Sequence, residues 1–368
     1  MSGSGAGGDV HEVASAARRA KAAGRILAKA SSQAKDEALR RAAELIDERQ
    51  ADILAANEVD LARAASSGAT PTVVDRLTLT PARISAMCSG IEAVIALPDP
   101  VGEVLEGWVR PNGLCVRRVR VPLGVVCVIY ENRPNVTSDA GVLCLKSGNA
   151  ALLRGSSGAI ESNKQIAACL RDGAEKAGLS PDVVVLVEDV RHESVREIVR
   201  LRGLVDCVIP RGGPELVRTI VENATVPYVI DGDGNCHVYV DAAADLDSAV
   251  RIVQNAKTQR PSVCNAMESL LVHESVAPAV LPRLAEALEG VEIRGDAATR
   301  AILPSAADAT EEDFATEFLA LTLSVAVVPS LDAAIEHIAR YGSGHSEAIV
   351  TSDKGAADRF VREVDAAA

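Results

Sequence analysis

From residue 123 onward, the chain alternates short, continuously apolar segments with segments of helical periodicity. The apolar segments cover residues 123–130, 150–153, 183–187 and 205–209. Strands that are buried on both faces of a parallel sheet have uninterrupted apolar sequences of this kind. Parallel strands also need crossover connections, and these are right-handed in nearly every known fold. The alternation therefore predicts a doubly wound α/β domain.

A second series of the same kind follows a polar break at residues 231–234, where two aspartates alternate with two glycines. We predict strands over residues 269–273, 323–328 and 348–350, and helices over residues 246–257, 276–288, 332–341 and 354–364. A chain of 368 residues is too long for one ordinary domain. The sequence thus predicts two or three domains, with one boundary near residues 229–234.

The segments before residue 123 have different patterns. Apolar residues recur at helical spacing from residue 10 to about residue 65, which predicts amphipathic helices. Thr80 and Pro81 supply an N-cap and a first helical residue, and they open a predicted helix that ends near residue 97.

Residues 103–109 and 114–121 then alternate charged and apolar side chains around Pro111-Asn112-Gly113, which favours a hairpin turn. This alternation predicts a β-ribbon with one face covered. An edge hairpin on the main sheet is the alternative.

Charge and composition exclude several classes of protein. A net charge of −13 and an isoelectric point near 5.0 leave no basic stripe for phosphates, and 2% aromatic residues leave few rings for base stacking. No apolar run approaches the roughly 20 residues that a bilayer span needs. Residues 1–8 contain no basic region followed by an apolar stretch. We therefore expect a cytoplasmic protein with a short disordered N-terminal tail.

The eight cysteines show no paired C-x-x-C spacing, which disfavours a disulfide framework or a zinc site. They lie at positions 88, 115, 127, 144, 169, 207, 236 and 264. Several are inside apolar strand or helix patterns. We expect the seven cysteines before Cys264 to be small residues of the core.

Cys264 lies in a more reactive setting. Lys257 and Arg260 precede it, and nearby positive charge favours the thiolate, which is the nucleophilic form. Pro261 and Ser262 break the helical pattern, so we expect Cys264 at a change of chain direction where a second short helix begins. On these residues alone, a buried and inert cysteine remains the alternative.

Several motifs occur together and in order along the chain. They are Tyr130-Glu131-Asn132-Arg133-Pro134-Asn135-Val136-Thr137, Leu145-Lys146-Ser147-Gly148-Asn149-Ala150, Ile209-Pro210-Arg211-Gly212-Gly213, Gly234-Asn235-Cys236-His237-Val238-Tyr239-Val240 and the segment from Asn255 to Asn265. With them the chain resembles the gamma-glutamyl phosphate reductases of proline biosynthesis, a branch of the aldehyde dehydrogenase superfamily. The resemblance runs from the first helices to Ala368.

This resemblance implies an aldehyde dehydrogenase-like α/β fold. It places an NADP-binding domain at residues 1–102 and 122–230, an interface hairpin at residues 103–121, and a catalytic domain at residues 231–368. The family pattern continues beyond Ala368, so the catalytic domain is expected to be C-terminally incomplete, with weak or no reductase activity and poor assembly.

The cofactor implied by the resemblance is NADPH. Arg211, Gly212 and Gly213 map onto the dinucleotide loop, where a strand passes through a glycine pair into a helix. After the predicted strand 150–153, one cation and two hydroxyls could hold the adenosine ribose and its 2′-phosphate. These are Arg154, Ser156 and Ser157, and no acidic residue follows them before Glu161, which favours NADPH over NADH. Glu317 maps to the glutamate that orients the nicotinamide ribose.

For the reaction, the resemblance implies that Cys264 attacks the acyl carbon of L-glutamate 5-phosphate and forms a thioester, which hydride then reduces. Asn135 and the backbone N–H of Cys264 are the candidate oxyanion donors, although Asn135 could instead cap a helix. Arg133, Lys257 and Arg260 are the candidate cations for the carboxylate and phosphate of the substrate, with His237 and His345 as weaker candidates. Around residues 230–234 there is no glutamate to activate water, which favours acyl phosphate reduction over aldehyde oxidation.

Two other functions remain open at this point. One is an oxidative aldehyde dehydrogenase acting on another substrate. The other is an inactive truncated paralogue or fragment that binds only nucleotide or a partner subunit. For a complete enzyme we expect a homo-oligomer, with glutamate 5-kinase as a candidate partner, and no metal, nucleic acid or membrane.

Overall fold

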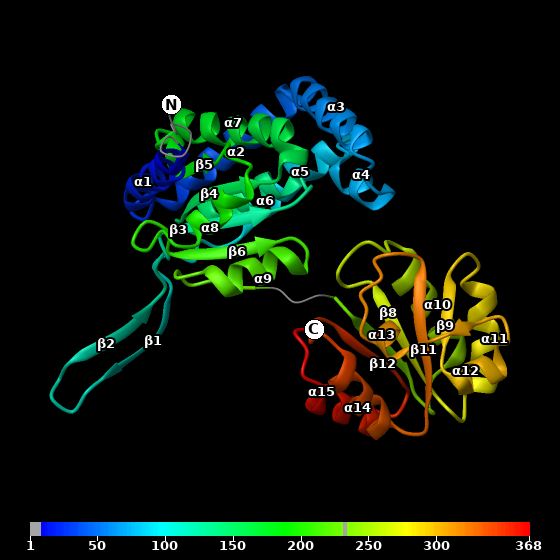
Figure 1. Cartoon of the computed structure of the whole chain (residues 1–368). Helices are drawn as coiled ribbons and strands as arrows, with labels where there is room; N and C mark the ends of the chain where they lie inside the picture. Colours follow the sequence, from blue (N-terminus) through cyan, green and yellow to red (C-terminus); the bar gives the residue numbers. More distant parts are fainter. Residues whose placement is uncertain (1–8, 231–233) are drawn as a thin grey trace. The chain divides into compact units, whose positions relative to one another are not determined.

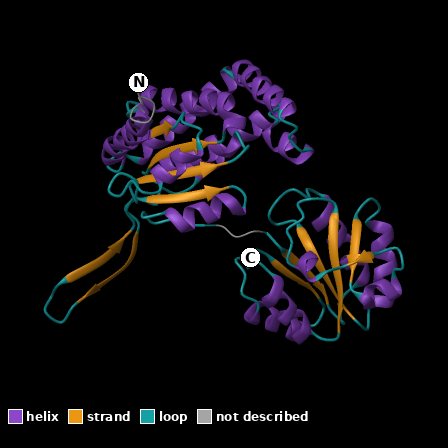
Figure 2. Ribbon diagram, viewed as in Figure 1, coloured by secondary structure: helices purple, strands orange, loops and turns teal. Residues whose placement is uncertain are grey.

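The computed structural model describes residues 9–230 and 234–368, and the predicted N-terminal tail at residues 1–8 lies outside them. The chain divides into two compact units, Met1–Asp231 and Gly232–Ala368 (Figure 1). Each unit contains a parallel sheet with helices on both faces (Figure 2). The prediction of α/β architecture is confirmed.

The first unit is built on a four-stranded parallel sheet with the strand order β5-β4-β3-β6. Its strands are β3 (Val125–Tyr130), β4 (Ala150–Gly155), β5 (Val184–Leu186) and β6 (Cys207–Arg211). Every residue of β3 and β4 is buried, as their continuous apolar sequences predict. The sequence predicts strands at residues 123–130, 150–153, 183–187 and 205–209. Each observed strand begins and ends within two residues of the predicted one.

Successive residues of β3 point to opposite faces of this sheet and join two different cores. Val126, Val128 and Tyr130 pack with helices α2, α5, α6 and α7, whereas Val125, Cys127 and Ile129 pack with α1, α8 and α9. The helices of this unit are α1 (Asp9–Leu27), α2 (Ser32–Glu48), α3 (Gln50–Ser66), α4 (Pro71–Leu77), α5 (Pro81–Ala96), α6 (Asn135–Lys146), α7 (Ile160–Lys176), α8 (His192–Ile198) and α9 (Pro214–Asn223), with short 3₁₀ turns at Ser157–Ala159 and Pro181–Val183.

Helix α5 begins as the sequence predicts. The side chain of Thr80 accepts a hydrogen bond from the Arg83 N–H, and Pro81 occupies the first helical turn. Helix α4 was not predicted, although Thr70 and Pro71 give it the same start signal. Its seven residues are too few to show a helical period.

The predicted hairpin forms, but its environment differs from the prediction. Strands β1 (Val104–Val109) and β2 (Cys115–Val119) make a separate two-stranded sheet, so the alternative of an edge hairpin on the main sheet is wrong. Gly113 closes the turn at φ 84°, and the Arg110 N–H donates to the Leu114 carbonyl. All of β1 and four of the five residues of β2 are exposed, so within the described chain the expected covered face is not present.

The second unit has a six-stranded parallel sheet with the order β10-β9-β11-β8-β7-β12. Its strands are β7 (Cys236–Val240), β8 (Met267–His273), β9 (Glu292–Gly295), β10 (Ala307–Asp308), β11 (Thr322–Val328) and β12 (Glu347–Val350), and its helices are α10 (Leu246–Thr258), α11 (Ala277–Ala287), α12 (Ala297–Ile302), α13 (Glu311–Phe314), α14 (Leu331–Tyr341) and α15 (Lys354–Glu363). Helices α10 and α11 cover one face, and α14 and α15 cover the other.

The predicted elements of this unit form within two residues of their expected bounds, while the strands β7, β9 and β10 and the helices α12 and α13 were not predicted. Strands β9 and β10 are short, and β9 carries the charged residues Glu292 and Arg294 while β10 is exposed, so neither has a continuous apolar run. Among the helices of the described residues, none is long and apolar enough to cross a membrane.

Candidate active site

Cys264 lies in a turn, residues 261–266, that connects α10 to β8 and is called here the Cys264 turn. The chain does change direction at this point, but no short helix begins here, so that prediction is wrong. Two hydrogen bonds fix the turn, from the Val263 N–H to the Arg260 carbonyl and from the Ala266 N–H to the Val263 carbonyl. Cys264 is partly exposed, and the alternative of a buried cysteine is therefore excluded.

The backbone of the Cys264 turn packs directly against the start of β7. A Cβ atom placed on Gly234 would lie 1.7 Å from the Cys264 carbonyl oxygen, so only glycine fits at this position. The thiol of Cys236 lies 3.2 Å from the same oxygen and donates to it. Burial raises the pKa of Cys236 to about 12, so this second thiol is protonated at neutral pH.

The structure brings Glu317 to the same place. Its carboxylate oxygen Oε1 accepts a hydrogen bond of 3.0 Å from the Gly234 N–H. Glu317 belongs to the segment between α13 and β11, residues 315–321, which is called here the Glu317 loop. Two residues far apart in the sequence, Cys264 and Glu317, thus contact the same glycine.

The role predicted for Lys257 needs correction. Its side chain is 0% exposed and its ammonium lies 2.5 Å from a carboxylate oxygen of Glu268, which is also 0% exposed. A cation in this position is enclosed by protein and cannot contact a substrate from solvent. Arg260 is exposed. Arg133 is half-buried in the first unit.

The sequence contained a signal for Glu268 that was missed. It is the one acidic residue of strand β8, in which the first six of the seven residues are buried. A charge at a buried strand position needs a partner of opposite charge, and Lys257 supplies it.

In the first unit, the predicted cofactor residues follow the carboxyl ends of β4 and β6, the edge at which ligands bind in open α/β sheets. Arg154 is the last but one residue of β4 and is 5% exposed, and its guanidinium donates to the carbonyls of Val190 and Arg191 at 2.7 and 2.8 Å. Arg154 therefore fixes the segment before α8 and is not available to contact a 2′-phosphate, contrary to the prediction.

The two serines after β4 differ from one another. The Ser156 hydroxyl accepts from the Asn132 N–H and donates to the Asn132 side-chain oxygen, at 3.1 and 2.9 Å. Ser157 is exposed, and its carbonyl accepts a bond from Arg63. Ser156 therefore shapes the loop, while the hydroxyl of Ser157 faces solvent.

The glycine loop after β6 holds an anion of the protein itself. Gly213 is the N-cap residue of α9, and its N–H donates to a carboxylate oxygen of Glu131 at 3.0 Å. A Cβ atom on Gly212 would lie 2.5 Å from this carboxylate oxygen, so the missing side chain makes room for Glu131. The sequence analysis placed no acidic residue at this site, because Glu131 follows another strand, β3.

Asn135 is the first residue of α6 and is exposed. Its amide nitrogen donates to the Asp139 carboxylate at 3.0 Å, and Pro134 is the cap residue, with no side-chain cap bond. The alternative role of Asn135 as a helix N-cap is therefore wrong.

The two weaker candidates, His237 and His345, have different environments. His237 is 0% exposed and Nδ1 lies 3.0 Å from Glu347, so this histidine is a buried structural residue. His345 is partly exposed, and its Nδ1 lies 2.9 Å from the Ser346 hydroxyl and 4.0 Å from the Cys236 thiol. Of the other cysteines, five are buried as expected, Cys88 is partly buried and Cys115 is exposed on the hairpin.

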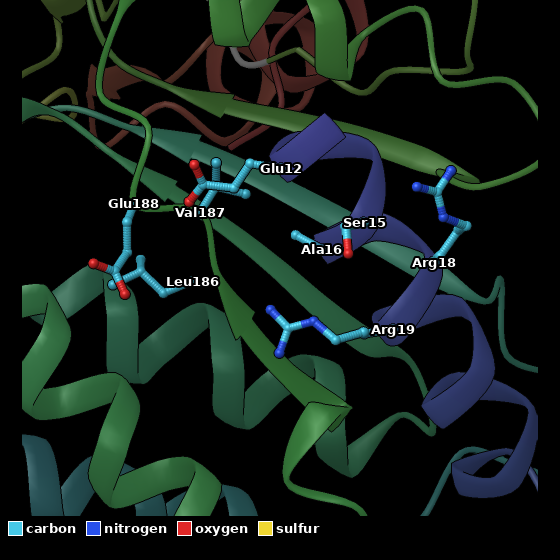
Figure 3. A pocket seen from close by; sticks show the side chains of 8 residues that line it. All are labelled: Glu12, Ser15, Ala16, Arg18, Arg19, Leu186, Val187 and Glu188. Carbon is cyan, nitrogen blue, oxygen red and sulfur yellow. The ribbon is translucent and has the colours of Figure 1, made fainter. Parts of the chain in front are cut away.

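A pocket of about 500 Å³ lies between α1 and the segment that follows β5 (Figure 3). Its lining includes Glu12, Ser15, Arg19 and Glu188. None of the predicted site residues lines it. The lining carries charges of both signs, and Arg19 is already paired with Asp182. We therefore interpret this pocket as a polar surface groove.

Comparison with known proteins identifies the family. The profile of the aldehyde dehydrogenase family matches residues 2–320. The gamma-glutamyl phosphate reductase of Thermobifida fusca is 53% identical over 98% of this chain and 86% of its own length, and that of Moorella thermoacetica is 54% identical over 97% and 86%. The chain belongs to the gamma-glutamyl phosphate reductase family.

Solved structures agree with this membership. The crystal structure of the gamma-glutamyl phosphate reductase from Thermotoga maritima matches with a TM-score of 0.91 at 46% identity, over 96% of this chain and 86% of that one. An acetylating aldehyde dehydrogenase from Geobacillus thermoglucosidasius matches with a TM-score of 0.69 at 17% identity, over 97% and 85%. The second match shows the shared aldehyde dehydrogenase fold.

Proposed function

We propose that this member of the gamma-glutamyl phosphate reductase family reduces L-glutamate 5-phosphate to L-glutamate 5-semialdehyde and phosphate, with NADPH as the reductant. The observation that carries the proposal is the position of Cys264. It is partly exposed, in a turn whose backbone contacts Gly234, and Gly234 in turn binds the carboxylate of Glu317.

Cys264 is the nucleophile in this proposal. Its thiolate attacks the acyl carbon, phosphate leaves with the electrons of the acyl–oxygen bond, and a thioester remains on the sulfur. After hydride addition, the resulting thiohemiacetal collapses, which releases the semialdehyde and returns the thiolate. Both tetrahedral species carry an oxyanion, for which we propose the Cys264 N–H and the Asn135 amide as donors.

NADPH, when bound, supplies the hydride. We propose that Arg211, Gly212 and Gly213 receive its phosphates and that Ser157 contacts the adenosine ribose. The residues present fit this group, because a Cβ atom on Gly213 would meet no atom within 4 Å and the backbone there is open to a ligand. The carboxylate of Glu131 must then leave the Gly213 N–H. Glu317 would orient the nicotinamide ribose, and Arg133 and Arg260 would bind the anionic groups of the substrate.

The hairpin is the proposed contact between subunits of a homo-oligomer. It exposes Trp108, Val109, Leu114 and Val121 by 45 to 75%, and a surface of this kind is typical of an interface. The acyl phosphate must come from a kinase that phosphorylates the side-chain carboxylate of glutamate, which makes glutamate 5-kinase the candidate partner. We further propose a cytoplasmic location for the enzyme.

A steady-state assay tests the proposed reaction. NADPH oxidation is followed at fixed protein concentration with freshly made glutamate 5-phosphate, and separately NADP reduction is followed with free aldehydes in the absence of phosphate. Turnover with the acyl phosphate supports the proposal. Turnover with free aldehydes alone would instead identify an oxidative aldehyde dehydrogenase, and the absence of both would support a binding protein without this activity.

A further inference from the structure

The buried pair Lys257–Glu268 has no direct role in the proposed reaction, yet it lies between the Cys264 turn and the Glu317 loop. Lys257 is in the last turn of α10, just before the Cys264 turn, and Glu268 is the second residue of β8, just after it. The pair therefore joins the two ends of the segment that carries the nucleophile. Their atoms are 2.5 Å apart and fully enclosed.

The second carboxylate oxygen of Glu268 reaches the Glu317 loop. Oε2 binds Lys257, and Oε1 accepts a hydrogen bond of 3.1 Å from the Leu319 N–H. Leu319 has φ 52°, which is in the left-handed region. A non-glycine residue in this region is strained, so the conformation persists only where surrounding contacts impose it. The bond from Leu319 to Glu268 is such a contact.

The same loop directs Glu317 towards the Cys264 turn. Glu317 is two residues before Leu319 and binds the Gly234 N–H, and Gly234 packs on the Cys264 carbonyl. A chain of contacts thus runs from Lys257 through Glu268, Leu319, Glu317 and Gly234 to Cys264.

We propose that Lys257 and Glu268 are positioning residues that hold the Glu317 loop in register with the Cys264 turn. The proposal rests on the proposed function in one respect, that Glu317 contacts the cofactor. Neither Lys257 nor Glu268 touches the substrate. Their task is to keep Leu319 in its strained conformation and so to keep the carboxylate of Glu317 at the Gly234 N–H.

The charges of the pair explain why both members are needed. Burial raises the pKa of Glu268 to about 7, and Lys257 and the Leu319 N–H oppose this rise. Glu317 in the loop and Cys236 on β7 are the other titratable groups that interact with Glu268. Burial likewise lowers the pKa of Lys257, against the attraction of Glu268. Removing either partner leaves the other ionised group enclosed without compensation, which is strongly unfavourable.

The decisive test is amide hydrogen exchange, because it needs neither cofactor nor activity. In Glu268→Gln, the one amide oxygen faces the Lys257 ammonium and the NH2 group, a donor, faces the Leu319 N–H, so exchange at Leu319 should become about tenfold faster, the ratio expected for the loss of one hydrogen bond. The matched control is Asp247→Asn, which removes the charge of another paired carboxylate of the same unit, one that is 74% exposed and bound to Arg283. Exchange in residues 315–321 should be unchanged in this control.

Two further variants separate positioning from general destabilisation. Lys257→Met should also increase exchange at Leu319. The double variant Lys257→Met with Glu268→Gln removes both charges and leaves an amide oxygen for the Leu319 N–H, so it should restore most of the protection. If Glu268→Gln does not fold, the double variant compared with Lys257→Met carries the test. Unchanged exchange at Leu319 in the folded single variants, or no recovery in the double variant, would overturn the proposal.

Kinetics then connect the loop to the reaction. Each single variant should raise the KM for NADPH by about tenfold or more, while the alkylation rate of Cys264 by iodoacetamide stays within about twofold of the wild type. If the proposed function fails, the wild type shows no NADPH turnover but the exchange result stands. Faster exchange without any change in the KM for NADPH would refute the link between loop position and cofactor.

Discussion

A methyl group added at Gly234 should displace the Cys264 turn. The Cβ atom of Gly234→Ala would lie 1.7 Å from the Cys264 carbonyl oxygen, 2.4 Å from its carbonyl carbon and 2.6 Å from its Cα. Ordinary van der Waals contact begins at 3.4 Å, so the two segments must separate by about 3.4 − 1.7 = 1.7 Å. A misplacement of about 1 Å can reduce a rate by about 100-fold, so kcat should fall by at least that factor. Stability should fall by about 1–3 kcal/mol, the usual cost of overpacking.

The measurement is kcat for NADPH oxidation, together with urea unfolding and the Kd for NADPH. The Kd for NADPH should rise by no more than about tenfold, because Glu317 binds the Gly234 N–H and is displaced with it, whereas the proposed phosphate-binding residues lie in the other unit. Gly90→Ala is the matched control. A Cβ atom at Gly90, inside α5, would meet no atom within 4 Å, so stability should be unchanged or rise by up to about 1 kcal/mol. A folded Gly234→Ala variant with ordinary kcat would refute the assigned contact between Gly234 and Cys264.

Three further predictions concern charge. Glu131→Gln should lower the Kd for NADPH by about threefold to tenfold, because the carboxylate that accepts from the Gly213 N–H no longer competes with the phosphate of the cofactor. A fluorescence titration measures this Kd, and a weaker or unchanged affinity would contradict the prediction. Ser157→Glu should shift the ratio of NADPH to NADH affinity by about tenfold towards NADH, since a carboxylate repels the 2′-phosphate, and an unchanged ratio would remove Ser157 from this site. Burial lowers the pKa of His337 from 6.5 to about 4 in the folded chain, so between these pH values the unfolded chain binds one more proton and the free energy of unfolding falls as the pH drops. In His337→Gln, the decrease in the free energy of unfolding between pH 7 and pH 4.5 should be smaller by about 1–2 kcal/mol. Urea unfolding at both pH values measures this difference.

The sheets could be predicted because burial on both faces leaves a direct mark on the sequence. The six residues of β3 and the six of β4 are all buried, and all but Arg154 and Gly155 are apolar or aromatic. The start of α5 was equally clear, since the Thr80 cap and Pro81 act through local geometry. The position of Cys264 in a turn followed from Pro261 and Ser262 in the same way.

The site residues whose roles could not be predicted are those that bind partners distant in the sequence. Lys257 is close to Cys264 in sequence and was read as a substrate-binding cation, but Glu268 returns on β8 and encloses it. Arg154 has the charge that a phosphate needs, yet its guanidinium is bound to carbonyls before α8, a segment more than thirty residues away. Glu131 reaches the glycine loop only because β3 and β6 are neighbours in the sheet.

The central claim is that Cys264 carries the acyl group, and intact-protein mass spectrometry tests it most directly. The chain is incubated with L-glutamate 5-semialdehyde and NADP without phosphate, so that the reverse reaction stops at the thioester, and phosphate is then added. The account predicts that the wild type gains the mass of one glutamyl group, that Cys127→Ala gains it as well, that Cys264→Ala does not, and that phosphate removes it. A glutamyl adduct that persists in Cys264→Ala, or that maps to another cysteine, would contradict the account.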